Sequence, residues 1–340
     1  MKTEFVPQAE LTDEAIERAG AVLRGGGLVV FPTETVYGLG ANALDANAAG
    51  KIYAAKGRPS DNPLIVHIAE PCEAEKYAVV CEDYDKLADA FMPGPLTVIL
   101  PKKSCIPDTV SGGLDSVGIR CPACGIARRL IRAAGVPVAA PSANLSGKPS
   151  PTTAAHTLAD LDGKVDMILD GGACRVGLES TIIKLENGKA TLLRPGGITP
   201  DMLRALIPSL TLADAVTNQL SPDARPLSPG MKYKHYAPAA PLTLVGGSDT
   251  RRRAYFAASA PDTLLLVFDE EADLFPDRNR IAIGGQKDVK AQASRLFAAL
   301  READKRGCAA ILAPLPEKEG LSLALYNRMI RAAAHRIVML

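Results

Sequence analysis

The sequence predicts an α/β fold in two globular parts. From residue 13 to about residue 194, short apolar runs alternate with helical stretches, and the same alternation returns beyond residue 241. The residues between, about 200–240, include a run rich in Pro and Ser that cannot propagate regular structure. A chain of 340 residues can bury two cores. We therefore predict a mixed α/β domain over residues 13–199, a linker over 200–240 and a smaller Rossmann-like parallel α/β domain over 241–340.

The first domain is expected to open with a helix and continue as a mixed sheet. Apolar residues fall on one face of residues 13–24, and the glycines at 25–27 end that helix before a strand over 28–31. Further strands are expected over residues 64–68, 96–100, 117–119, 136–139 and 167–169. Two last runs, 181–185 and 190–193, flank Asn187 and Gly188, whose positive φ suits the tight turn of an antiparallel hairpin.

The second domain has the strand and helix order of a parallel sheet. Strands are expected over residues 242–245, 263–268, 280–283 and 309–312, and helices over 289–300 and 321–335. Parallel neighbours need such crossover connections, whereas antiparallel neighbours can be joined by a short turn. The two domains are therefore predicted to differ in sheet type.

Composition excludes several classes of protein. The formal net charge of +1 provides no bulk basic field for nucleic acid, so an anion site must come from locally clustered Lys and Arg. No apolar run approaches the roughly 18 residues that span a bilayer, and the first residues lack the pattern of a secretory signal. Seven cysteines, an odd number scattered along the chain, indicate reduced thiols. We expect a soluble cytoplasmic protein with no membrane contact.

Three polar segments follow strands or a helix, where loops commonly meet ligands. The first, Pro32 to Gly40, groups hydroxyls at residues 33, 35 and 37. The second holds Lys56 and Arg58 beside a glycine, which suits a polyphosphate, although two cations could equally complement the end of a helix. The third, residues 141–150, is a hydroxyl-rich loop whose backbone N–H groups can approach phosphate or ribose, but it lacks the P-loop pattern.

Five motifs then occur in a fixed order along the chain. They are Pro32-Thr33-Glu34-Thr35-Val36-Tyr37-Gly38-Leu39, Lys56-Gly57-Arg58-Pro59, Asn62-Pro63-Leu64, Pro141-Ser142-Ala143-Asn144 and His235-Tyr236-Ala237-Pro238. Together they resemble the signatures of YrdC-type L-threonylcarbamoyladenylate synthases, in the long form with an extra C-terminal domain. The resemblance covers residues 13–199 and, through the linker and tail, nearly the whole chain. It implies a twisted open sheet with a large central cavity in the first domain.

The resemblance also implies an enzyme, a nucleotidyltransferase that converts L-threonine, bicarbonate or CO₂, and ATP to L-threonylcarbamoyl-AMP and pyrophosphate. This product feeds the modification of adenosine 37 in tRNAs reading ANN codons, so a transient contact with the downstream tRNA threonylcarbamoyl transferase machinery is expected. Mg²⁺ is expected to arrive with ATP, without a tightly bound metal held by the protein. Two alternatives stay open: an RNA-binding or ribosome-associated module with weak RNA contacts, and a carbamoyl-adenylate transferase.

The family match assigns individual residues as well. Lys56 and Arg58 are the catalytic candidates, because they can contact the triphosphate and neutralise charge on the departing pyrophosphate. Arg120 is the expected bidentate partner of the threonine carboxylate. The matched positions are, for ATP, Arg58, Asn62, Ser116, Ser142, Asn144, Ser150, Arg194 and Tyr236, and, for threonine, Thr35, His67, Arg120, Ala140 and Ser180.

Some remaining residues allow more than one interpretation. Glu34 and Glu179 could bind Mg²⁺, but structural hydrogen bonds to loop N–H groups explain them as well, and we assign them no metal role. Cys121 and Cys124 have C-x-x-C spacing without a second pair, which argues against zinc. The linker tail over residues 231–238 is expected to close over the nucleotide as a lid that excludes water.

Overall fold

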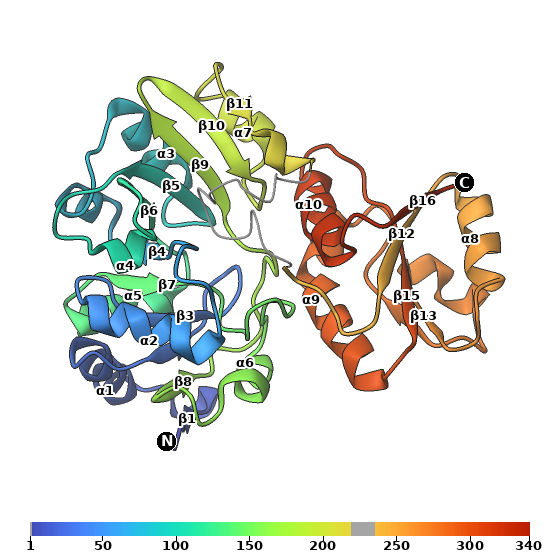
Figure 1. Ribbon diagram of the computed structural model, residues 1–340, viewed down its shortest axis with the longest axis horizontal. Helices are drawn as coiled ribbons and strands as arrows, with labels where there is room; N and C mark the ends of the chain where they lie inside the picture. Colours follow the sequence, from blue (N-terminus) through green and yellow to red (C-terminus); the bar gives the residue numbers. More distant parts are fainter. Residues whose placement is uncertain (1, 219–234) are drawn as a thin grey trace. The chain divides into compact units, whose positions relative to one another are not determined.

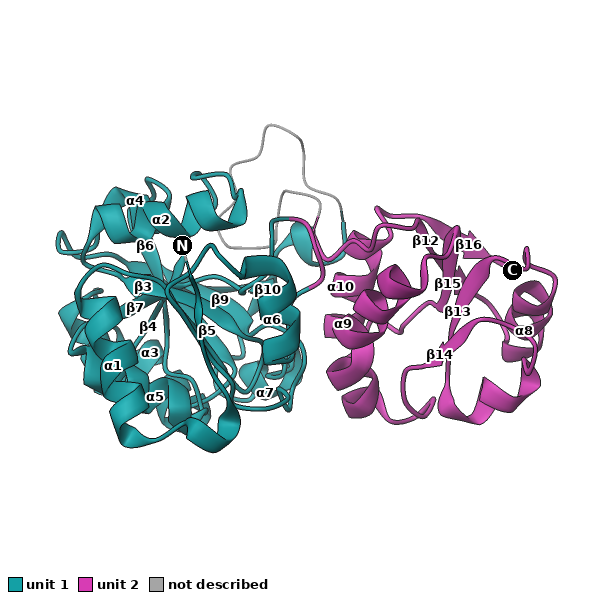
Figure 2. Cartoon of the chain, turned by 90° about the horizontal axis from the view of Figure 1, so that it is seen from below, with its two compact units in different colours: residues 1–146, 150–232 teal, residues 147–149, 233–340 magenta. Residues whose placement is uncertain are grey.

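The structure is a computed structural model that describes residues 2–218 and 235–340. The chain divides into two compact units, shown in different colours in Figure 2. The first comprises, of the described residues, 2–146 and 150–218, and the second comprises 147–149 and 235–340. The α/β fold class predicted from the sequence is confirmed in both units.

The first unit contains an 11-stranded mixed sheet within the described residues. Its strands follow the order β1-β8-β2-β3-β7-β4-β6-β5-β9-β10-β11, with parallel and antiparallel neighbours both present. The strands are β1 Glu4–Val6, β2 Val29–Phe31, β3 Gly38–Asn42, β4 Ile65–His67, β5 Leu96–Pro101, β6 Ser116–Arg120, β7 Val138–Ala140, β8 Met167–Leu169, β9 Thr181–Glu186, β10 Lys189–Arg194 and β11 Thr211–Leu212. Most of these strands are short, so a residue just outside a strand is only a few residues from the middle of that strand.

Helices cover this sheet and bury its apolar side chains. The helix predicted over residues 13–24 is α1, Asp13–Arg24, whose first turn is capped by the Thr12 hydroxyl accepting from the Ala15 N–H. It packs beside α5, Gly125–Ala134 (Figure 1). The other helices are α2 Ala46–Lys56, α3 Glu82–Phe91, α4 Asp108–Ser111, α6 Ala154–Leu161 and α7 Pro200–Arg204, with 3₁₀ turns at Gln8–Glu10, Pro71–Lys76 and Asp214–Val216.

The predicted hairpin is confirmed, whereas the strands β1, β3 and β11 were not predicted. β9 and β10 pair antiparallel, and their turn places Asn187 at φ 51° and Gly188 at φ 70°. The segment Pro32 to Gly40 was interpreted as a loop, but β3 begins at Gly38 and pairs with β2 and β7. Sequence patterns do not identify this strand, because its small residues lack the apolar side chains that are typical of strands.

The second unit has a five-stranded parallel sheet in the order β14-β13-β15-β12-β16. Helices α9 and α10 cover one face and α8 the other (Figures 1 and 2). Strand β16 was not predicted from the sequence. The elements are β12 Leu242–Gly246, α8 Asp249–Ala257, β13 Thr263–Val267, the 3₁₀ helix Asp269–Leu274, β14 Arg280–Ala282, α9 Val289–Arg306, β15 Ala310–Pro314, α10 Ser322–Ala332 and β16 Ile337–Met339. Among the described residues, no helix is long and apolar enough to cross a membrane.

Candidate active site

The predicted substrate residues lie at the two ends of neighbouring strands in the first unit. His67 and Arg120 are the last residues of β4 and β6, where the parallel register places them directly opposite each other. Asn62 and Ser116 lie at the other ends of the same strands. Ser142 follows β7, which runs antiparallel to β4, and so joins this second end. Ser116 and Arg120 are the first and last residues of β6, so the two groups are about 13 Å apart along this strand, at about 3.3 Å per residue.

Arg120 is the buried cation of the first end. Its residue surface is only 4% exposed. Its Nη2 donates to Glu34 Oε1 at 2.6 Å and to the Thr35 hydroxyl at 2.8 Å, while its buried Nε has no hydrogen-bond partner. The loop that presents Thr35 is shaped by the Thr33 hydroxyl, which donates to the Val36 carbonyl and accepts from the Thr35 N–H. The structure thus brings Thr35 and Arg120 together, although they are far apart in the sequence.

His67 lies beside Arg120 as a neutral side chain. Its Nδ1 is 3.0 Å from the Ile65 carbonyl oxygen, and its ring meets Phe31 edge-on at 5.9 Å. Burial, and next the positive charge of Arg120, lower the pKa of His67 to about 3. An uncharged imidazole at this position can donate or accept a hydrogen bond without repelling the guanidinium.

Ser180 and Arg194 form a second polar cluster at the start of β9 and the end of β10. Arg194 Nε donates to the Ser180 carbonyl at 3.0 Å, and its Nη2 reaches the Ser180 hydroxyl at 3.1 Å. Thr97 of β5 lies 2.7 Å from that hydroxyl. Thr97 was not predicted as a site residue, because its only signal in the sequence is a hydroxyl within an otherwise apolar strand. Predicted residue Ala140 is buried in β7.

The side chains of the catalytic candidates Lys56 and Arg58 both donate hydrogen bonds to backbone carbonyl oxygens. Lys56 is 3% exposed, and its Nζ donates to the carbonyls of Ser142 and Asn144. Arg58 donates to the Asn62 carbonyl at 3.2 Å through Nη2. The two cations therefore fix the loops that carry three of the other predicted ATP residues, Asn62, Ser142 and Asn144. Their assignment as triphosphate contacts stays a prediction.

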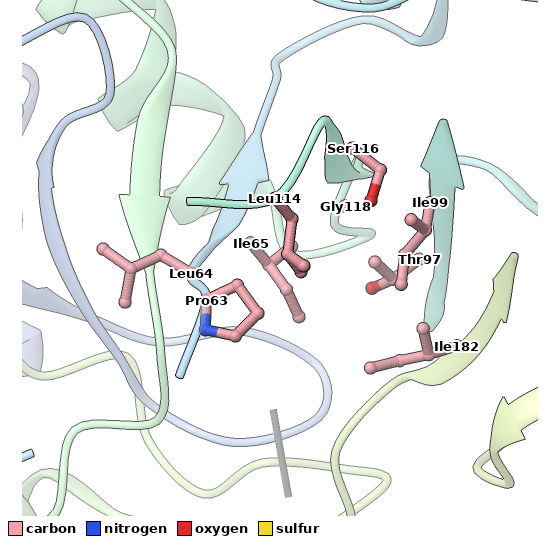
Figure 3. A pocket seen from close by; sticks show the side chains of 9 residues that line it. All are labelled: Pro63, Leu64, Ile65, Thr97, Ile99, Leu114, Ser116, Gly118 and Ile182. Carbon is pink, nitrogen blue, oxygen red and sulfur yellow. The ribbon is translucent and has the colours of Figure 1, made fainter. Parts of the chain in front are cut away.

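A small apolar pocket adjoins Ser116, at the end of β4 and β6 where Asn62 also lies. Figure 3 shows its lining residues, which belong to strands β4, β5, β6 and β9 and to the segments before β4 and β6. It is lined by Pro63, Leu64, Ile65, Thr97, Ile99, Leu114, Ser116, Gly118 and Ile182. Its enclosed volume is about 10 Å³, room for about one water molecule, so a larger aromatic group would contact its apolar lining from outside.

The buried acids make protein hydrogen bonds. Glu34 Oε2 accepts the N–H groups of Ala123 at 3.0 Å and Cys124 at 3.3 Å, as the structural interpretation of this residue expected. Glu179 Oε1 accepts from the Ser150 hydroxyl. In the parts of the chain that the structure describes, no group of three or more His, Cys, Asp or Glu side chains could hold a metal ion.

Tyr236 belongs to the second unit by its contacts. Its side chain is buried, its φ is 63°, and its ring stacks on Phe297 of α9 at 5.3 Å with the Arg328 guanidinium 5.7 Å from its centroid. The assignment of Tyr236 to ATP stays a prediction. The lid segment 231–238 is described only from residue 235 onward, and its residues 231–234 lie outside the described residues.

Comparison with known proteins covers both units. The family model described as "Telomere recombination" matches residues 21–196, and the model described as "Threonylcarbamoyl-AMP synthase, C-terminal domain" matches residues 198–334. The threonylcarbamoyl-AMP synthase of Pyrococcus abyssi is 44% identical, with 95% of each chain covered. That of Bacillus subtilis is 42% identical, over 96% of this chain and 95% of its own. The crystal structure of P. abyssi Sua5 complexed with L-threonine superposes over 100% of both chains, with a TM-score of 0.90 and 42% identity.

Proposed function

Because this chain belongs to the threonylcarbamoyl-AMP synthase family, we propose that it condenses L-threonine, bicarbonate or CO₂, and ATP into L-threonylcarbamoyl-AMP, with release of pyrophosphate and, when bicarbonate is the carbon source, of water. The chain spans 95% of the length of each of these two relatives. The P. abyssi relative was crystallised with L-threonine, which supports threonine as the amino acid substrate.

The observation that carries the proposal is the placement of two complementary sets of groups at the two ends of β4 and β6. At one end, buried Arg120 has an Nε without a protein acceptor and stands beside Thr35 and neutral His67, a setting that suits the threonine carboxylate. At the other end, Asn62 and Ser116 stand where the nucleotide would bind. A separation of about 13 Å along β6 leaves room for a carbamate between them.

The chemistry follows from this arrangement. Threonine's amine takes up CO₂ or bicarbonate, and a carbamate oxygen then attacks the α-phosphorus while the bond to pyrophosphate breaks. Such a transfer needs positioning and charge neutralisation more than a strong base. Lys56 and Arg58 hold the loops and face the phosphates in this proposal, and the adenine ring packs against the apolar lining of the pocket beside Ser116.

Mg²⁺ enters this scheme with ATP. Glu34 and Glu179 accept protein hydrogen bonds, and the proposal assigns them no metal role. Mg²⁺ bound to the phosphates would reduce their negative charge, while the cations of the chain orient them. The product is then used by the machinery that modifies tRNA, which is the expected partner.

Pyrophosphate release tests the proposal. With purified full-length chain, we expect release that requires threonine and bicarbonate together, and we expect Arg120→Lys to lower it mainly through a higher KM for threonine. Release that is independent of threonine would favour a carbamoyl-adenylate transferase. No release together with tight RNA binding would favour the RNA-binding alternative.

A further inference from the structure

Glu34 makes three hydrogen bonds that meet at the predicted threonine end of the site. Its side chain is 4% exposed. Oε1 accepts from Arg120 Nη2 at 2.6 Å, and Oε2 accepts from the N–H groups of Ala123 and Cys124, which precede α5. One carboxylate therefore ties the guanidinium to the start of a helix. That helix is packed on α1, so the anchor is rigid.

The hydrogen bonds from Arg120 to Glu34 and Thr35 use one nitrogen of its guanidinium, Nη2. A guanidinium has five N–H donors, two of them on Nη2. Glu34 and Thr35 both accept from Nη2, whereas the buried Nε has no acceptor. A buried N–H without a partner is costly, so a position of this kind is favourable for an incoming acceptor. Because both hydrogens of Nη2 are already used, a substrate carboxylate would meet Nε through one charge-assisted hydrogen bond and not through the expected bidentate pair.

We propose that Glu34 is a positioning residue for the amino acid substrate, which fixes Arg120 so that its Nε is directed at the substrate carboxylate. The inference rests on the proposed function, since it assumes that threonine binds at Arg120. Glu34 itself does not touch the substrate in this scheme. It acts through the guanidinium, and its own negative charge compensates the buried cation before substrate arrives.

The hydrogen-bond pattern requires a carboxylate at position 34. Glutamine has the same shape, but only one of its two terminal atoms accepts hydrogen bonds. If that oxygen faces Arg120, the amide NH₂ opposes the N–H groups of Ala123 and Cys124. If the oxygen faces those N–H groups, the NH₂ opposes the guanidinium. In Glu34→Gln, the side chain therefore cannot hold Arg120 and the helix start together.

Calorimetric titration of the full chain with L-threonine, and separately with ATP, tests the proposal. We expect Glu34→Gln to weaken threonine binding by roughly 10- to 100-fold, the usual range for one hydrogen bond to a charged group, and to leave ATP affinity within about twofold. In steady state, KM for threonine should rise more than kcat falls. Unchanged or tighter threonine binding would overturn the proposal, because tighter binding would mean that Glu34 merely repels the carboxylate.

A matched control shows whether weaker threonine binding is specific to Glu34 or follows from the loss of any buried ion pair. Glu271 of the second unit is also fully buried and bonded to an arginine, with Oε1 2.6 Å from Arg252 Nη2. Glu271→Gln is expected to leave threonine affinity unchanged. A double-mutant cycle with Arg120→Lys adds a second readout, since the effects of Glu34→Gln and Arg120→Lys should not add if Glu34 acts through Arg120. Additive effects would contradict the proposal.

Two further outcomes are distinguishable. If Glu34→Gln does not fold by circular dichroism, Glu34→Asp keeps the charge but retracts the carboxylate, and it should also weaken threonine binding while ATP binding persists. Threonine binding equal to wild type in Glu34→Asp would then overturn the proposal. If the wild-type chain itself binds ATP but no threonine, the proposed function fails instead.

Discussion

Gly196 lies against the backbone that presents Ser180, and Gly196→Ala is our most quantitative prediction. A Cβ at this position would lie 2.5 Å from the Thr181 nitrogen, 2.7 Å from the Glu179 carbonyl oxygen and 2.8 Å from the Ser180 carbonyl carbon. Ordinary contacts of a Cβ begin near 3.4 Å, so the two segments must separate by about 0.9 Å. Overpacking of this kind costs about 1–3 kcal/mol of unfolding free energy.

The same displacement should impair the reaction. Moving a positioned group by about 1 Å can lower a rate by about 100-fold, and Ser180 is bonded to both Arg194 and Thr97. Gly197→Ala is the control, because its Cβ would meet only side-chain atoms, Pro95 Cγ at 3.2 Å and Val176 Cγ1 at 3.5 Å. Urea unfolding and threonine-dependent pyrophosphate release measure the two effects. A Gly196→Ala protein as stable and as active as Gly197→Ala would refute this reasoning.

Three further predictions concern single residues. Gly118→Val should raise KM for ATP about tenfold and change KM for threonine little. The reason is that a side chain at this position would point at Thr97 and fill the apolar pocket. An unchanged KM for ATP would contradict the placement of adenine at this pocket. Gly188→Val should cost about 1 kcal/mol or more of stability, since φ is 70° there, while leaving both KM values unchanged. The pKa of His67 is about 3 in the native state and about 6.5 in the unfolded chain, so the unfolded chain alone takes up this proton below pH 6.5. Stability should therefore fall as pH decreases from about 6.5 towards 3, and His67→Gln should flatten that dependence in urea titrations; equal slopes for the two proteins would contradict it.

Local patterns were enough for most of the fold. Buried strands are apolar in sequence, which revealed β5 and β9, and Asn187 with Gly188 identified the hairpin because few residues accept positive φ. Strand β3 escaped because its Gly-Leu-Gly-Ala-Asn sequence has neither alternation nor β-branched side chains. It is a strand because neighbours on both sides pair with it, and such long-range pairing has no local signal.

The candidate site was predicted less completely, for a related reason. The motifs identified Arg120 and Thr35 as residues for one substrate, and the structure places them in contact. The bond from Arg120 to Glu34 joins residues 86 positions apart, so the sequence offered only an acid with several interpretations. The contacts of Lys56 with the carbonyls of the 142–144 loop were likewise invisible, because backbone acceptors leave no trace in residue type.

The central claim is that one chain joins three substrates into an adenylate. The most direct measurement supplies labelled bicarbonate to the full-length chain with ATP and threonine, and follows the label by chromatography and mass spectrometry. The account predicts label in a threonylcarbamoyl adenylate, formed in equal amount to pyrophosphate and only when all three substrates are present. Pyrophosphate formed without label in any adenylate, or label in an adenylate formed without threonine, would contradict it.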